Sequence, residues 1–203
     1  GELRVLGEPV ADMDVRASAE RVGYVFQDPE NQIVCETVWH EMAFGLENLG
    51  LARDEMRRRV AETSYFFGLE DWLHRDTDTL SGGRKQLLSL AAVLALRPRV
   101  LLLDEPLGAL DLKLRKEMQQ ELKYIQQEVG ITFIFVTHDQ EEALILADSI
   151  AVMSEGELLQ LGSAEEVFHH PANDYIASFL GLNDIVWKDD GSVLKVCLLY
   201  TSP

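Results

Sequence analysis

The strongest signal in the sequence is the segment Val100-Leu101-Leu102-Leu103-Asp104-Glu105-Pro106. Its apolar run is too short for a helix and does not alternate, which is typical of a strand buried in a parallel sheet. The two acids follow at the carboxyl end of the strand, where open α/β sheets bind their ligands. One carboxylate there can hold Mg²⁺, and the next can orient an attacking water or take its proton. The alternative is a strand followed by a solvated acidic turn.

Further strands and helices are expected on both sides of this stretch. We predict a short strand over Arg21–Phe26 that ends at Gln27, and a second buried strand over Ile131–Val136. An amphipathic helix with its apolar stripe from Leu114 to Val129 separates the acidic pair from that second strand, and Gly130 closes the helix. Apolar strands that alternate with helices predict an α/β fold with a parallel sheet.

The region between the first strand and the acidic strand has a helical pattern. It runs from Asp28 to about Thr79, with Gly68 placed as a helix C-cap, and Ser81 is predicted to be the N-cap of the next helix. Towards the other end of the chain, residues 150–153 and 158–161 are predicted as a hairpin, and Ser163 starts a capping box for a short helix.

Composition excludes several classes of protein. The 203 residues are 47% hydrophobic, and 18 basic against 35 acidic residues leave a net charge of −17, which disfavours nucleic-acid binding. Cys35 and Cys197 lie far apart without zinc spacing, so we interpret them as small apolar side chains in a reducing compartment. The apolar run Leu87–Leu96 falls short of the ~20 residues that span a bilayer. We therefore expect a cytosolic chain, truncated at its start.

Three weaker signals accompany the acidic pair. Leu80-Ser81-Gly82-Gly83-Arg84 places two glycines at a helix start, where exposed N–H groups and the helix dipole favour phosphate. His138 follows the strand that ends at Val136 and can hydrogen-bond a terminal phosphate, while Gln27 can touch both a metal and water. Each has an ordinary alternative: a serine-capped helix, a surface histidine and a loop cap.

The order and spacing of these signals resemble the ATP-binding cassette (ABC) ATPases, the motor subunits of ABC transporters, from Gly1 to about Gly181. Five motifs of that family have counterparts here. The resemblance makes Gln27 the Q-loop glutamine, Leu80–Gly83 the signature, Asp104 and Glu105 the Walker B pair, Asp111 the D-loop aspartate and His138 the switch histidine.

The resemblance implies a RecA-like P-loop NTPase core with an inserted helical subdomain, and ATP and Mg²⁺ as cofactors. In family terms the catalytic residues are Glu105, His138 and Gln27, and Asp104 with Gln27 holds the metal. Ser81, Gly82, Gly83 and Asp111 would contact the nucleotide of a second ATPase subunit bound head to tail, in a homo- or heterodimer. The implied divisions are a core remnant (1–27), the helical subdomain (28–97), the core (98–162), C-terminal helices (163–184) and a tail (185–203).

The chain departs from the family at the Walker A loop, GxxxxGK[ST], because it contains no Gly-Lys dipeptide. We expect a missing N-terminal segment, and therefore weak ATP binding and no turnover by these 203 residues. Arg84 stands where the family usually has Gln, and Leu87 where it often has Arg.

The two halves of the chain resemble different branches of the family. Gln27–Ile33 and Glu41–Asn48 are similar to energy-coupling-factor ATPases, which power uptake of vitamins and of cobalt or nickel ions. Pro106–Arg115, Thr137–Ala143 and His170–Asn173 are similar to spermidine/putrescine (polyamine) importer ATPases. A hybrid of the two branches is one hypothesis. The end of the tail, Val196–Pro203, has no family counterpart, and we interpret it as translated sequencing-adapter sequence.

The resemblance favours an importer ATPase on the inner face of the cell membrane, which drives a separate permease and does not act on nucleic acid. A cassette for DNA or ribosomes would carry a long coiled coil or two cassettes in one chain. A second hypothesis is a non-catalytic cassette fragment that only pairs with an intact ATPase subunit. A third is an unfolded fragment, because loss of the Walker A strand leaves sheet edges unpaired.

Overall fold

The computed structural model describes residues 2–180, and the side chains of residues 127–129 and 140 are left aside. The chain divides into two compact units. Unit 1 comprises the residues up to Lys116 together with Ile125–Ile134, and unit 2 comprises Glu117–Tyr124 together with the residues from Phe135 onward. Cys197 and the tail over residues 185–203 lie outside the described residues.

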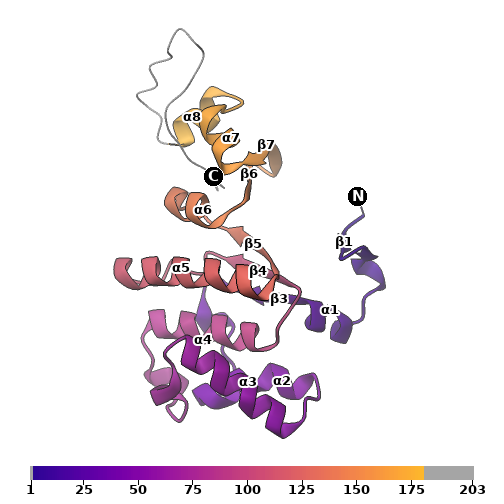
Figure 1. The fold of residues 1–203 in the computed structure, drawn as a ribbon, viewed down its shortest axis with the longest axis vertical. Coiled ribbons are helices and arrows are strands. Elements are labelled where there is room, and N and C mark those ends of the chain that lie inside the picture. Colours follow the sequence, from indigo (N-terminus) through magenta and orange to yellow (C-terminus); the bar gives the residue numbers. More distant parts are fainter. Residues whose placement is uncertain (1, 181–203) are drawn as a thin grey trace. The chain divides into compact units, whose positions relative to one another are not determined.

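A parallel sheet forms the centre of unit 1, as the apolar stretches predict. Strand β3 (Val22–Val25) pairs in parallel with β4 (Val100–Asp104), and Val25 lies opposite Leu103 in the register. The order of the sheet is β3-β4-β5, with β5 spanning Thr132–Val136 (Figure 1). The expected α/β fold with a parallel sheet is confirmed. Strands β3 and β4 therefore end at the same edge of the sheet, next to the acidic pair.

The prediction that β5 is buried is wrong. Its residues alternate between exposed and half-buried, with Ile134 45% and Val136 37% exposed. Successive side chains of a strand point to opposite faces of the sheet, so this alternation means that one face of β5 is covered less than the other. Strand β4 is buried more evenly, because Val100, Leu101 and Leu103 are all nearly inaccessible.

Helix α4 (Gly82–Ala95) packs on the strand β3, and Gly23 allows the close approach. A Cβ atom built on Gly23 would lie 2.4 Å from Cγ1 of Val93 and 2.9 Å from Cδ1 of Leu101. Any larger residue would push the helix off the sheet. The glycine thus sets the distance between the helix that follows the Ser-Gly-Gly turn and the strand that leads to Gln27.

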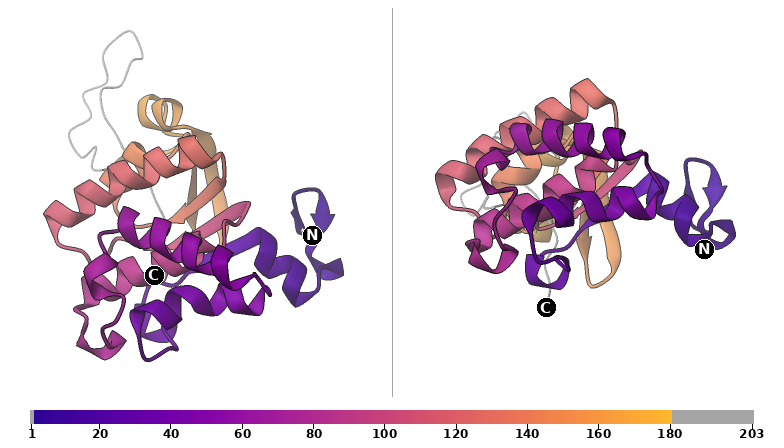
Figure 2. Two further views of the ribbon diagram at one scale, coloured as in Figure 1. Left: turned by 60° about the horizontal axis from the view of Figure 1, so that its bottom comes forward. Right: turned by 90° about the horizontal axis from the view of Figure 1, so that it is seen from below.

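Helices α2 (Val38–Asn48) and α3 (Arg53–Phe66) pack on α4 and on each other (Figures 1 and 2). Their shared core includes Met42, Leu46, Val60 and Leu88, each at most 1% exposed. The predicted helical region is confirmed, and Gly68 follows the end of α3 with a φ of +61°. The 3-10 turn η2 (Pro29–Asn31) lies between β3 and α2, and the turns η3 (Glu70–Trp72) and η4 (Thr77–Thr79) lie between α3 and α4.

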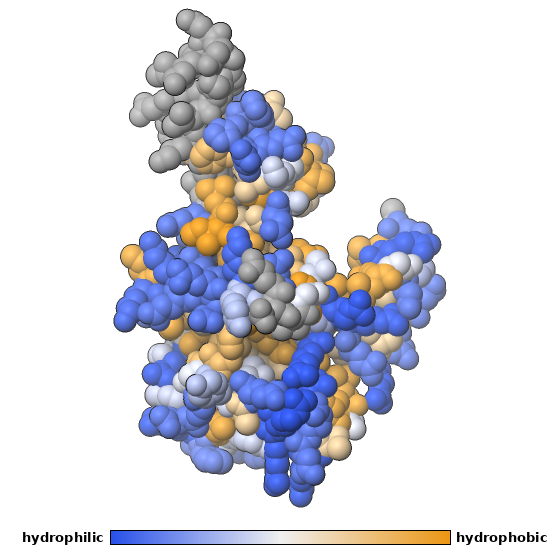
Figure 3. Space-filling model, viewed as in Figure 1, coloured by the Kyte–Doolittle hydropathy of each residue, from blue (hydrophilic) through white to orange (hydrophobic). Residues whose placement is uncertain are grey.

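The outer face of α3 is strongly hydrophilic (Figure 3). Arg58 forms ion pairs with Glu55 at 2.7 Å and with Glu62 at 2.6 Å on this face. Because Glu55 and Glu62 on the same helix neutralise the charge of Arg58, we interpret this face of α3 as an ordinary solvated helix surface.

The first twenty residues form elements that the sequence patterns do not predict. Strands β1 (Arg4–Val5) and β2 (Glu8–Pro9) pair, η1 (Val10–Asp12) follows, and α1 (Val15–Arg21) leads into β3. The side chain of Asp14 caps α1 by accepting a hydrogen bond from the Ala17 N–H at 2.7 Å.

Helix α5 (Leu112–Val129) contributes to both units, and Gly130 ends it with a φ of +67°, as predicted. The rest of unit 2 contains α6 (Gln140–Leu146), the strands β6 (Ser149–Ser154) and β7 (Glu157–Ser163), α7 (Ala164–His169) and α8 (Asp174–Phe179). The predicted hairpin is confirmed, and so is Ser163 as the N-cap of α7, whose side chain accepts a hydrogen bond from the Glu166 N–H. Within residues 2–180, no helix is long and apolar enough to cross a membrane.

Candidate functional site

The ends of β3 and β4 bring Gln27 and Glu105 together. The side-chain Nε2 of Gln27 donates a hydrogen bond to Oε2 of Glu105 at 2.6 Å, across 78 residues of sequence. Glu105 follows β4 directly and Gln27 lies two residues after β3, and parallel strands end at the same edge of a sheet. An amide and a carboxylate that were predicted from separate motifs therefore meet in space.

Glu105 also has an unusual backbone. Its φ of +44° lies in the left-handed region, which costs a residue with a Cβ about 1–3 kcal/mol. The turn is held by the buried Pro106 and by a hydrogen bond from the Gly108 N–H to the Glu105 carbonyl at 3.1 Å. Strained conformations of this kind concentrate where function requires them.

Asp104, the last residue of β4, is oriented by a neighbour on the adjacent strand. The hydroxyl of Tyr24 donates a hydrogen bond to its Oδ2 at 3.1 Å. Burial first, and then the hydrogen bond to Asp104, raises the pKa of Tyr24, so the phenol keeps its proton at neutral pH. One carboxylate oxygen of Asp104 is thus held by the protein. Sequence reasoning missed Tyr24, because it sits among the apolar residues of a strand.

The loop after β3 is tied to α4 by side chains that the sequence patterns did not single out. Gln32 Oε1 accepts from the Phe26 N–H at 2.9 Å, and Gln86 Nε2 donates to the Phe26 carbonyl at 3.3 Å. Lys85 Nζ, on a side chain only 9% exposed, pairs with Glu30 Oε1 at 2.6 Å. These contacts join the loop that carries Gln27 to the first turns of the helix that begins with the Ser-Gly-Gly turn.

The Ser-Gly-Gly turn lies open at the start of α4. Ser81 occupies the predicted N-cap position, but its side chain makes no capping hydrogen bond, so the cap is made by position only. Ser81 and Gly82 are exposed, and nothing lies within 4 Å of a Cβ built on Gly82. A Cβ on Gly83 would meet Leu110 Cδ2 at 3.3 Å. The first N–H groups of a helix have no partner within the helix, so this turn can receive an anion.

Asp111 has a local structural task. Its Oδ1 accepts hydrogen bonds from the N–H groups of Lys113 at 3.1 Å and Leu114 at 3.0 Å, which caps α5. Its predicted contact with a nucleotide stays a prediction.

The predicted switch residue belongs to unit 2. His138 is exposed between β5 and α6, after the buried Thr137. The Thr137 hydroxyl donates to Glu142 Oε2 at 2.9 Å and accepts from the Asp139 N–H at 3.0 Å. This network fixes the backbone on both sides of the histidine. The expected meeting of His138 with the acidic pair stays a prediction.

Comparison with known proteins decides the family. The family model for ABC transporters matches residues 1–108, which is more than half of the chain. The chain belongs to the ABC transporter ATPase family. This confirms the resemblance that was drawn from its motifs.

Curated relatives of this ABC ATPase include spermidine/putrescine import ATP-binding proteins PotA. The protein of Roseobacter denitrificans is 47% identical over 185 residues, covering 89% of the chain and 49% of the relative. That of Ruegeria pomeroyi is 52% identical over 184 residues, with the same coverage. The chain spans about half the length of these relatives.

Solved ABC structures share the fold. The structure of cbiO1 from Clostridium perfringens, described as part of the ABC transporter complex cbiONQ, superposes with a TM-score of 0.73 at 33% identity, covering 91% of this chain and 73% of that one. The ATP-binding cassette MJ0796, a dimer in a post-hydrolysis state bound to ADP and Pi, gives 0.72 at 28% identity, with coverages of 80% and 73%. Both branches named from the motifs are thus represented among the similar proteins.

The donor groups at this edge suit the magnesium ion that ABC ATPases typically use. Mg²⁺ prefers oxygen ligands and is bound through one or two carboxylates plus phosphate oxygens and waters. The Asp104 carboxylate and the amide oxygen of Gln27 are donor groups of this kind. Within the described part of the chain, no cluster of three His, Cys, Asp or Glu residues could hold a metal alone. The residues fit an ion whose remaining ligands come from a nucleotide and water.

Proposed function

We propose that this chain is the ATP-binding and ATP-hydrolysing part of an ABC importer that drives uptake through a separate membrane permease. The observation that carries the proposal is the hydrogen bond between Gln27 and Glu105 at 2.6 Å. Asp104, the last residue of β4, directly precedes Glu105. This edge supplies the two groups that phosphoryl transfer to water requires, an acid for the metal and a carboxylate for the water.

The roles of the residues follow from their chemistry. Asp104, with one oxygen held by Tyr24, would bind Mg²⁺ together with Gln27. Glu105 would orient the attacking water in line with the γ-phosphate and take its proton. His138 would hydrogen-bond the γ-phosphate. Magnesium supplies charge neutralisation of the phosphate oxygens when it is bound.

The exposed signature turn supports a composite site. Ser81 and Gly82 face solvent at the start of α4, and we propose that they, Gly83 and Asp111 contact the nucleotide held by a second ATPase subunit. Two copies, or this chain and a related one, would close head to tail. We also propose residues 28–97 as the helical subdomain that passes nucleotide state to the permease, residues 1–27 and 98–162 as core, and residues 163–184 as C-terminal helices.

The relatives suggest the transported class. Because proteins named for spermidine/putrescine import align with up to 89% of the chain, we propose polyamine uptake, with the energy-coupling-factor type as the second candidate on the likeness to cbiO1. The subunit would lie on the cytoplasmic face of the membrane, bound to its permease.

The 203 residues contain no Gly-Lys dipeptide, and we propose that they bind Mg·ATP weakly and do not turn it over unless a Walker A segment is supplied. A non-catalytic cassette that only pairs with an intact subunit is the second candidate. The exposed signature turn suits that role equally well, so activity with a supplied Walker A segment decides between the two.

The test joins the chain behind the N-terminal, Walker A-containing segment of a full-length relative. We expect Mg·ATP hydrolysis, and a loss of about 10²–10⁴-fold in kcat for Glu105→Gln with ATP binding retained, because a general base contributes about that much. Glu157→Gln, on an exposed residue of β7, is the matched control and should hydrolyse ATP normally. Equal turnover by Glu105→Gln and the parent would refute the proposal.

A further inference from the structure

A tryptophan close to the signature turn is stacked by two arginines. The guanidinium carbon of Arg84 lies 3.6 Å from the centroid of the Trp72 ring, and that of Arg75 lies 4.1 Å from it. Two guanidinium groups cannot occupy one position over a ring, so both faces of the indole are used. Planar guanidinium groups stack well on aromatic faces.

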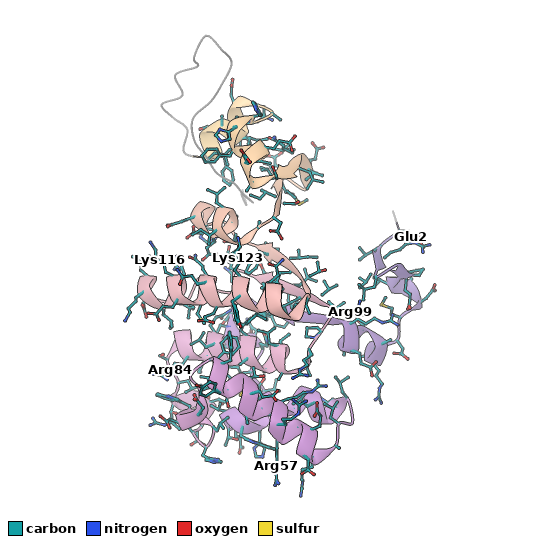
Figure 4. All side chains as sticks on the ribbon, viewed as in Figure 1. Glu2, Arg57, Arg84, Arg99, Lys116 and Lys123 are labelled. Atoms are coloured by element: carbon teal, nitrogen blue, oxygen red, sulfur yellow. The ribbon has the colours of Figure 1, made fainter. Side chains whose placement is uncertain are left out.

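The backbone around Trp72 holds the ring in place. Trp72 ends η3, where its N–H donates to the Leu69 carbonyl at 2.9 Å and its carbonyl accepts from the Arg75 N–H at 2.8 Å. Arg84 comes from a different element, the first turn of α4, directly after the two glycines (Figure 4). The stack therefore connects a rigid turn to the residue that completes the signature.

The N–H donors of the two stacked guanidinium groups are not used by other side chains of the described residues. Among the described residues, Arg84 and Arg75 form no ion pair or side-chain hydrogen bond, although the chain carries an excess of acids. Arg84 is half-buried, and its neighbours Ser81 and Gly82 are exposed. Arg84 thus brings a planar fork of N–H donors to the first turn of a helix whose initial N–H groups have no partner within the helix, a combination that suits phosphate oxygens.

We propose that Trp72 is a positioning residue that presents Arg84 to the terminal phosphate of the nucleotide at the signature turn. The inference rests on the proposed function, because it concerns the same turn. A glutamine at this place is neutral, whereas Arg84 adds a positive charge and can bind two phosphate oxygens at once. The stack restricts the long side chain to the side of the turn, and the guanidinium offers its N–H edge to phosphate while its face stays on the ring.

The first experiment uses Trp72 as the reporter. The chain has three tryptophans, so Trp39→Phe and Trp187→Phe leave Trp72 alone. Inorganic tripolyphosphate is titrated into this variant at constant ionic strength while the emission of Trp72 is recorded. We expect a saturable change in emission, with a Kd that rises at least fivefold in Arg84→Gln and by a smaller factor in Arg84→Lys, which keeps the charge but lacks the planar fork.

Arg75→Gln is the matched control, because Arg75 stacks on the same ring but lies outside α4. Its Kd for tripolyphosphate should stay within twofold of the parent. An equal loss in Arg75→Gln and Arg84→Gln would show a general effect of charge and overturn the proposal, as would an unchanged Kd in Arg84→Gln.

A second pair of variants tests the role of Trp72 itself, by calorimetric titration of tripolyphosphate. Trp72→Phe keeps an aromatic face and should keep the affinity within twofold, whereas Trp72→Ala should weaken it like Arg84→Gln. A purely structural role would be shown by equal affinities in Trp72→Ala and the parent, and this would overturn the proposal.

Failure of the proposed function gives a different pattern. Glu105→Gln should leave the Kd of tripolyphosphate, measured through Trp72 emission, unchanged. The reason is that the proposed function places Glu105 in the other half of a composite site, away from Arg84. Absent hydrolysis in the chain with a supplied Walker A segment, together with Arg84-dependent binding, would refute the ATPase proposal and support the phosphate contact. Normal hydrolysis with Arg84-independent binding would do the reverse.

Discussion

At the scale of single residues, Glu105 combines a strained backbone with a direct contact to Gln27. Its φ of +44° is a conformation in which only glycine avoids a steric cost. The strain places the carboxylate against an amide that arrives from a distant part of the chain. A residue selected for stability alone would be glycine, so the presence of glutamate points to a chemical task.

The corresponding prediction concerns the stability of Glu105→Gly. We expect the free energy of unfolding to stay unchanged or to rise by up to about 1 kcal/mol, because relief of left-handed strain offsets the extra chain entropy and the lost hydrogen bond. Urea denaturation followed by circular dichroism measures it. Glu157→Gly, within strand β7, is the control and should lose about 0.5–1 kcal/mol. A loss above 1 kcal/mol in Glu105→Gly would show that the side chain stabilises the turn.

At the scale of elements, the link between the loop after β3 and α4 depends on one nearly buried cation. The Lys85 side chain is 9% exposed, whereas its partner Glu30 is 64% exposed. An ion pair of this kind is screened by water on one side, but a buried ammonium without a partner is costly. The pair therefore secures the position of the loop more than it adds to stability.

A double-mutant cycle tests this link. Glu30→Gln should cost about 1 kcal/mol, because it leaves the Lys85 ammonium without its opposite charge. Lys85→Met, a change to an apolar side chain of similar length, should be close to neutral, and the double variant should lose less than the sum of the two. The free energies come from urea denaturation. Additive losses would mean that the two side chains do not interact.

Elements with a strong local signal could be predicted from the sequence. The run from Val100 to Leu103 identified β4. Ser163 marked the start of α7, and Gly130 marked the end of α5. Helix α1 was missed, because only Asp14 announces it and its Val15 is 87% exposed. The prediction that β5 is buried was wrong, because the sequence of a strand does not show which of its faces a neighbouring element covers.

The candidate site was predictable only in part. Glu105 and Gln27 follow strands, so their meeting at one edge follows from parallel topology. The contacts of Tyr24 with Asp104, and of Trp72 with Arg84, depend on tertiary packing between distant segments. No local pattern announces such pairs.

At the scale of the whole molecule, the proposed function assigns two halves of a nucleotide site to this chain. One half is the acidic edge of β4 and the other is the exposed turn at the start of α4, and similar structures include a cassette described as a dimer with ADP and Pi. In a twofold dimer each surface meets the other surface of the partner. The central claim is therefore that hydrolysis needs Glu105 from one subunit and the signature turn from the next.

The most direct test is the rate of ATP hydrolysis by a mixture of two inactive variants, both made in the chain with a supplied Walker A segment. Glu105→Gln removes the carboxylate, and Gly82→Asp places a negative charge in the turn, where the structure has room for it. Each variant alone should be inactive. An equal mixture should regain about a quarter of the parent's hydrolysis, because half of the dimers are mixed and each of these has one intact site. A mixture that remains inactive at every ratio would contradict the claim.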